Sequence, residues 1–132
     1  MNNGQLREVV EVRTKDNIIL KKTFQLALES IKVGRSLQEN KKEFVISRQL
    51  MRSGTSVGAM TKEAQHAESK ADFIHKMSIA LKEANETEYW IELLLESGLA
   101  ENIDTVLLAS SLMESVKLIT SIVKTAKQNQ KK

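Results

Sequence analysis

The chain of 132 residues contains no cysteine and no proline, and it has few glycines and few aromatic residues. The absence of cysteine excludes disulfide bonds and thiolate metal sites. Because proline is absent and there are only five glycines, long helices can run without interruption. Aromatic residues, which strands favour, make up only 4% of the chain. These shortages exclude a typical sheet protein and predict an all-α fold.

Leu, Ala, Glu, Lys and Ser are among the commonest residues in the chain, which is a composition typical of helices. Hydrophobic residues make up 41% of the chain. No apolar run approaches the roughly 20 residues of a membrane span, and the first residues do not resemble a signal peptide. We therefore expect a cytoplasmic protein that has no membrane partner.

The net charge of +3 is unevenly distributed. Residues 1–62 hold 12 Lys or Arg and 6 Asp or Glu, residues 63–116 hold 3 and 11, and residues 117–132 hold 5 Lys and no acid. This pattern favours either pairing between subunits or contact with nucleic acid, and the charges alone leave both open.

The apolar spacing predicts four long helices with short connections. Asp16 or Asn17 is expected to cap the first helix, which should end near residues 39–41, and Asn40 with Glu43 resembles the next N-cap. Ser69 and Asp72 form a capping box for a third helix, which Gly98 should end, and Asn102 is the expected cap of the fourth.

Short connections place consecutive helices side by side and antiparallel. The predicted architecture is an up-down-up-down antiparallel four-helix bundle over residues 17–127. A poorly defined N-terminal arm (residues 1–16) precedes it, and a polar basic tail (residues 128–132) follows.

Apolar stripes identify the expected core and a second contact surface. In the first helix the stripe comprises Leu20, Phe24, Ala27, Leu28, Ile31 and Leu37. The third helix has a core stripe and a second row beside it. Because one stripe is enough to bury a helix in its own bundle, the second row predicts a homo-oligomer interface. Its members are Ile74, Leu81, Tyr89 and Trp90.

Small residues crowd the middle of the second helix, where Gly54 and Gly58 each cost about 1 kcal/mol relative to alanine. They indicate either close approach of a neighbouring helix or a bend that aims Arg48, Arg52 and Lys62 at a ligand. Both interpretations are compatible with the spacing. We also expect Arg52 to pair with Glu83 or Glu86 of the antiparallel third helix.

No catalytic constellation is visible. Glu63 with His66, and Asp72 with His75, suggest a carboxylate metal site, but they lie at a helix end and a cap and are not expected to converge on one ion. The row Glu88, Glu92 and Glu96 has the i,i+4 spacing of a solvated helix face. We therefore expect no metal, no cofactor and no enzymatic activity.

A separate group of cations on the first two helices is expected to contact phosphates, although no aromatic RNA-binding motif accompanies it. The candidate nucleic-acid-binding residues are Lys21, Lys22, Lys32, Arg35, Lys41, Lys42 and Arg48.

The sequence resembles the small bacterial four helix bundle proteins, which include the 23S rRNA intervening-sequence proteins and the accessory variability proteins of diversity-generating retroelements. The resemblance covers roughly residues 17–126. It is carried by Gln49-Leu-Met-Arg-Ser-Gly-Thr-Ser-Val-Gly-Ala59, Glu63-Ala64, Ser69-Lys-Ala-Asp-Phe-Ile74, Ser78-Ile-Ala80 and Glu83-x-x-Glu-Thr-Glu88.

This resemblance implies a four-helix bundle in a ring-like homo-oligomer, which is a pentamer in retroelement members. In those members it also implies binding to nucleic acid and to a reverse transcriptase through a basic outer surface. The leading hypothesis is therefore a non-enzymatic bundle that binds RNA or DNA. The alternative is a protein-interaction scaffold whose basic residues serve subunit contacts only.

Overall fold

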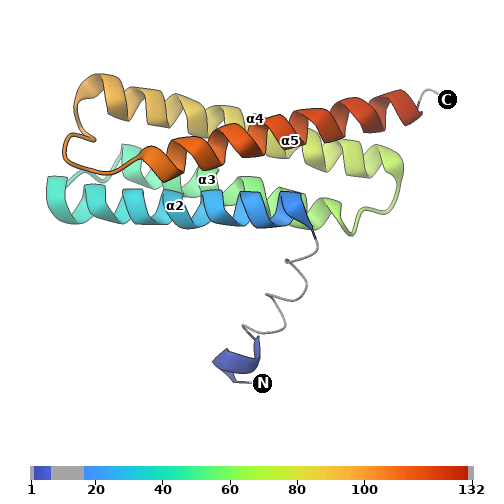
Figure 1. Cartoon of the computed structure of the whole chain (residues 1–132), viewed down its shortest axis with the longest axis horizontal. Coiled ribbons are helices and arrows are strands. Elements are labelled where there is room, and N and C mark those ends of the chain that lie inside the picture. Colours follow the sequence, from blue (N-terminus) through green and yellow to red (C-terminus); the bar gives the residue numbers. More distant parts are fainter. Residues whose placement is uncertain (1, 7–16, 131–132) are drawn as a thin grey trace.

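The computed structural model describes residues 2–6 and 17–130, and over these it forms an antiparallel bundle of four long helices (Figure 1). The helices are α2 (Ile18–Lys41), α3 (Ile46–Ala64), α4 (Lys70–Ser97) and α5 (Val106–Gln130). Residues 3–6 are also helical, and no strand occurs in the described ranges. The all-α prediction is therefore confirmed. Most of the predicted N-terminal arm, residues 7–16, lies outside the described residues.

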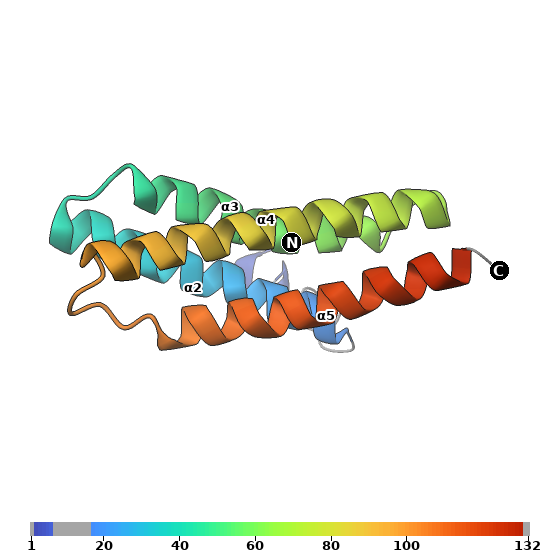
Figure 2. The same ribbon diagram turned by 90° about the horizontal axis from the view of Figure 1, so that it is seen from above.

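The four helices form a ring of neighbours in cross-section. α2 packs against α3 and α5, and α4 packs against the same two helices, whereas the backbones of α2 and α4 are not adjacent. Figure 2, seen from above, shows α3 and α4 along one side and α2 and α5 along the other. α2 and α4 therefore lie at opposite corners of the bundle, and their outer faces point in opposite directions.

Local signals set two helix starts and one helix end where the sequence placed them. The Asn17 side chain accepts a hydrogen bond from the Leu20 N–H, and the Ser69 side chain accepts one from the Asp72 N–H. Gly98 ends α4 with a φ of 79°, a left-handed conformation that glycine adopts without steric cost.

The structure corrects the two other predicted caps. α2 continues past Asn40 to Lys41, and α3 begins only at Ile46, after the Glu43 carboxylate accepts hydrogen bonds from the N–H groups of Val45, Ile46 and Ser47. Asn102 is left-handed (φ 67°) within the α4–α5 loop, and the Asp104 carboxylate accepts from the Val106 N–H instead. In both places the free backbone N–H groups donate to a carboxylate that lies closer to the helix in the sequence than the predicted cap residue does.

The buried face of α2 differs from the predicted stripe. Leu20 and Leu37 are buried as expected, but Phe24, Leu28 and Ile31 are exposed by 53%, 44% and 36%. The helix instead buries a face of mixed polarity, which comprises Ile19, Leu20, Thr23, Leu26, Glu29, Ser30, Val33, Gly34 and Leu37. Because hydroxyl residues and a glycine interrupt this face, hydrophobic spacing alone does not identify it as the buried one.

The small residues of α3 allow close packing against α2. A Cβ atom added at Gly54 would collide with the Ser30 side chain, and one added at Gly58 would lie 3.3 Å from the Thr23 carbonyl oxygen. Hydroxyl groups fill the same layer, where Thr23 Oγ1 and Thr61 Oγ1 are hydrogen-bonded at 3.1 Å. These contacts are those expected from the close-approach interpretation.

α5 completes the bundle and extends to Gln130, so residues 128–130 of the predicted tail are helical. By length and composition α5 is apolar enough to cross a membrane, a test that core helices of soluble proteins also pass. Its buried residues include Leu108, Leu112, Ile119 and Val123, which belong to the hydrophobic core.

Candidate nucleic-acid interface

Three of the predicted phosphate-binding residues gather around the α2–α3 connection. Lys41, Lys42 and Arg48 are exposed and form no ion pair with another described residue. The Lys42 ammonium donates to the Glu39 carbonyl oxygen, and the Arg48 guanidinium lies 5.7 Å from the centre of the exposed Phe44 ring. We call Lys41, Lys42 and Arg48 the basic corner.

Glu43 lies within this segment, but its carboxylate is directed to the start of α3. Burial raises the pKa of Glu43. Hydrogen bonds lower it, and they come from the N–H groups of Ser47, Ile46 and Val45 and from the Ser47 side chain. The hydrogen bonds outweigh burial, so the pKa lies below 4.5. The negative charge therefore compensates free backbone N–H groups at the helix start. The neighbouring cations keep their charge available to a ligand.

The structure places the other predicted cations differently. Lys22 is ion-paired with Glu114 of α5 at 2.7 Å, Lys32 with the nearly buried Glu29 at 3.2 Å, and Arg35 with Glu39 at 3.7 Å. Lys21 is exposed on the outer face of α2. The seven predicted residues thus form no single continuous site.

Arg52 joins α3 to α4 through ion pairs, as predicted from the sequence. Its Nη1 lies 3.1 Å from Glu83, and its Nη2 contacts Glu86, which also accepts a hydrogen bond from the Trp90 indole at 3.1 Å. The same helix pair is joined inside the bundle by Thr87, which donates to the Ser53 hydroxyl at 2.9 Å. Arg52 is therefore committed to holding the two helices together.

The predicted interface row on α4 is only partly available to another subunit. Ile74 is 9% exposed and belongs to the core of its own chain, so its side chain offers little to a neighbour. Leu81 and Trp90 are half-buried against that core, whereas Tyr89 is 55% exposed. Use of this row in an oligomer stays a prediction.

In the described part of the chain, no three His, Asp or Glu side chains are placed to share a metal ion. Glu63, His66 and Asp72 line an open cavity at the α3–α4 turn together with Lys62 and Lys76. Glu68 also lines this cavity, and the Lys76 ammonium lies 3.9 Å from the Glu63 carboxylate and 4.0 Å from the Asp72 carboxylate.

Exposed aromatic and aliphatic side chains are the feature that sequence reasoning missed. Phe24 and Leu28 belong to the predicted core stripe of the first helix, yet they lie on the surface, and the exposed Phe44 lies beside Arg48. The sequence does contain a signal for the buried face. Thr23, Ser30 and Gly34 lie on a second face of α2 that has the same helical period.

The family model described as 23S rRNA-intervening sequence protein matches residues 15–121. The chain belongs to this family. A solved structure of a protein of unknown function from the S23 ribosomal protein family of Bacteroides thetaiotaomicron is 44% identical to it, with a TM-score of 0.74.

That match covers 81% of this chain and 99% of the other. No curated protein matches the chain. The recognised resemblance and the helical bundle are therefore confirmed, and neither the family description nor the description of the solved structure names an enzymatic activity.

Proposed function

We propose that this chain is a non-enzymatic, self-associating helical bundle that binds nucleic acid through the basic corner. The observation that supports the proposal is the exposure of Lys41, Lys42 and Arg48 within eight residues, without carboxylate partners among the described residues. Such cations can contact phosphates and release counterions.

The family description, which refers to an intervening sequence of 23S rRNA, makes RNA the first ligand to test. The sequence contains no recognisable base-reading motif, so we expect weak sequence preference. Self-association would repeat the corner, and several modest contacts would then act together on one long strand. A reverse transcriptase as a protein partner stays a prediction from the resemblance alone.

The test is a titration of structured RNA and of duplex DNA at low and high salt. Replacing Lys41, Lys42 and Arg48 with Gln should weaken binding and reduce the salt dependence by up to roughly three counterions, because each lost phosphate contact removes about one.

A matched control replaces the exposed Lys70, Lys82 and Lys124 with Gln, which changes the net charge by the same amount. If the control weakens binding equally, general charge accounts for the effect and the basic corner is not the site. Absence of binding to both nucleic acids at low salt would favour the scaffold alternative, which the exposed apolar side chains also support.

A further inference from the structure

The outer face of α2 combines apolar and basic side chains. Phe24, Leu28 and Ile31 follow one another at spacings of four and three residues, so they form one exposed stripe. Lys21, Lys32 and Arg35 flank the stripe, and we call these six residues the α2 outer face. α2 as a whole holds five Lys or Arg and two Glu. An apolar centre with a charged rim is typical of a protein interface and not of a phosphate-binding surface.

The outer face of α4 has the opposite charge over the second half of the helix. Tyr89 and Leu95 are exposed by 55% and 54%, and the half-buried Leu81 lies further along the helix. The exposed Glu88, Glu92 and Glu96 accompany them, and none of the three makes an ion pair with another described residue. Residues 83–116 contain no Lys or Arg. We call Leu81, Glu88, Tyr89, Glu92, Leu95 and Glu96 the α4 outer face.

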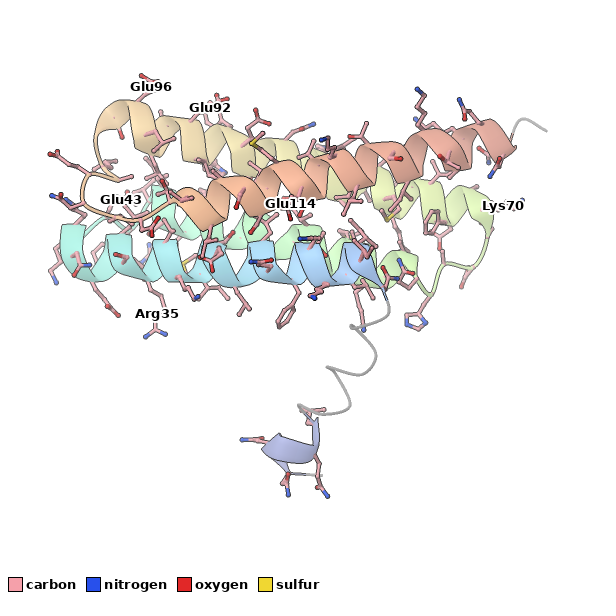
Figure 3. All side chains as sticks on the ribbon, viewed as in Figure 1. Arg35, Glu43, Lys70, Glu92, Glu96 and Glu114 are labelled. Carbon is pink, nitrogen blue, oxygen red and sulfur yellow. The ribbon has the colours of Figure 1, made fainter. Side chains whose placement is uncertain are left out.

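These two faces cannot meet within one chain, because α2 and α4 occupy opposite corners of the bundle. Figure 3 shows Arg35 pointing away from the bundle on the α2 side and Glu92 and Glu96 pointing away on the α4 side. All three labelled residues lie toward the same end of the bundle. A second copy placed alongside, with its axis parallel and without a shift along it, would bring Arg35 level with these glutamates.

We propose that the α2 outer face of one copy packs against the α4 outer face of the next copy. The inference rests on the self-association in the proposed function and identifies its contact surfaces. Because the two surfaces differ and face opposite ways, the contact is heterologous. Repeating it without rotation produces an open row of copies, and a rotation between successive copies closes a ring; neither arrangement is a symmetric dimer.

This pairing changes the role of three predicted nucleic-acid-binding residues. Lys21, Lys32 and Arg35 form the rim of a subunit interface, whereas the basic corner stays available to nucleic acid. The two roles can be tested separately, since the residues of the interface and of the corner do not overlap.

The experiment is a charge exchange measured by light scattering at micromolar protein concentration. One variant carries Lys21→Glu and Arg35→Glu, a second carries Glu92→Lys and Glu96→Lys, and a third combines all four changes. Lys32 is left intact because it pairs with the nearly buried Glu29.

The wild-type protein should have a mass of several times 14.9 kDa. Each two-residue variant places like charges on both sides of the contact and should lower the mass, while the combined variant should regain the wild-type mass. Circular dichroism checks that each variant stays helical. Folded two-residue variants that keep the wild-type mass, or a folded combined variant that stays dissociated, would overturn the proposed contact.

The apolar part of the contact has its own pair of variants. Leu28→Ser on the α2 outer face should lower the mass, whereas Met113→Ser should not, because Met113 is 72% exposed on α5 and belongs to neither face. The reverse result would place the interface on α5 and refute the proposal. A monomeric wild-type protein that still binds RNA would refute the subunit contact and leave the basic corner as a nucleic-acid site.

Discussion

Single carboxylates decide where two of the helices begin. Glu43 accepts three backbone N–H groups at the start of α3, and Asp104 accepts one at the start of α5. Neither residue occupies the position at which the sequence pattern placed the cap. A side chain that reaches the free N–H groups stabilises the start of the helix, whichever residue carries it.

Replacing Glu43 with Gln should destabilise the fold by about 1 kcal/mol at pH 7, because the helix start loses a charged acceptor. The pKa of Glu43 is lower in the folded protein than its usual 4.5, so its stabilising contribution is complete above that value. The contribution is lost as the pH falls through the lowered pKa.

Urea unfolding at pH 7 and at successively lower pH values measures this difference. Glu101→Gln in the exposed α4–α5 loop serves as the control and should change stability little at either extreme. A difference between wild type and Glu43→Gln that stays constant over the whole acid range would contradict the capping role of the charge.

Arg52 and Glu83 should show a measurable coupling, because they join α3 and α4 at 3.1 Å while Glu83 is only 19% exposed. A double-mutant cycle with Arg52→Met and Glu83→Gln is expected to give about 0.5–1 kcal/mol, a modest value since Arg52 remains 47% exposed. Trp90, the sole tryptophan, reports unfolding by its fluorescence. Additive single effects would show that the pair contributes nothing of its own.

At the scale of helices, the spacing between α2 and α3 depends on side-chain size. Gly54 and Gly58 face α2 where Ser30 and Thr23 leave no room for larger groups. Sterics outweigh helix propensity here, because alanine would otherwise stabilise each position by up to about 1 kcal/mol. The exposed stripe of Phe24, Leu28 and Ile31 lies on the opposite side of α2, where packing imposes no such limit.

Gly54→Ala should therefore destabilise the protein by about 1–3 kcal/mol, since the new methyl group would collide with Ser30. Gly58→Ala should destabilise the protein less, because the new Cβ atom would lie 3.3 Å from its nearest neighbour, the Thr23 carbonyl oxygen. Thermal unfolding compares the two variants, and Ser30→Gly should relieve the first. If both substitutions stabilise the protein alike, the helices do not pack as closely as described.

At the scale of the molecule, the bundle presents unlike faces at opposite corners, with net positive charge on α2 and negative charge on the second half of α4. A molecule built this way is suited to repeated side-by-side association. The basic corner shares no residue with either face, so association and nucleic-acid binding can be tested with separate variants.

If folded copies associate, the melting temperature should depend on protein concentration, because association stabilises the folded state and not the unfolded chain. We expect it to rise with concentration for wild type. It should stay constant for the variant carrying Lys21→Glu and Arg35→Glu, which serves as the dissociated control. Calorimetry over a hundredfold concentration range measures this, and a concentration-independent wild type would contradict association.

The sequence by itself determined the helical class, the number of long helices and the Ser69 and Gly98 boundaries. It narrowed the first cap to Asp16 or Asn17 and the partner of Arg52 to Glu83 or Glu86. These features depend on spacing within about one helical turn or on the register of two helices joined by a short connection. Such constraints are local, and a single chain displays them directly.

Only the tertiary structure decided which face of α2 is buried and which cations remain available. Both faces of α2 have helical period, and the buried one is diluted by Thr23, Ser30 and Gly34 because close packing against α3 requires small side chains there. Likewise, Lys22 is neutralised by Glu114, ninety-two residues away in the sequence. Burial and pairing between distant helices are properties of the assembled bundle, because they depend on which surfaces the neighbouring helices cover.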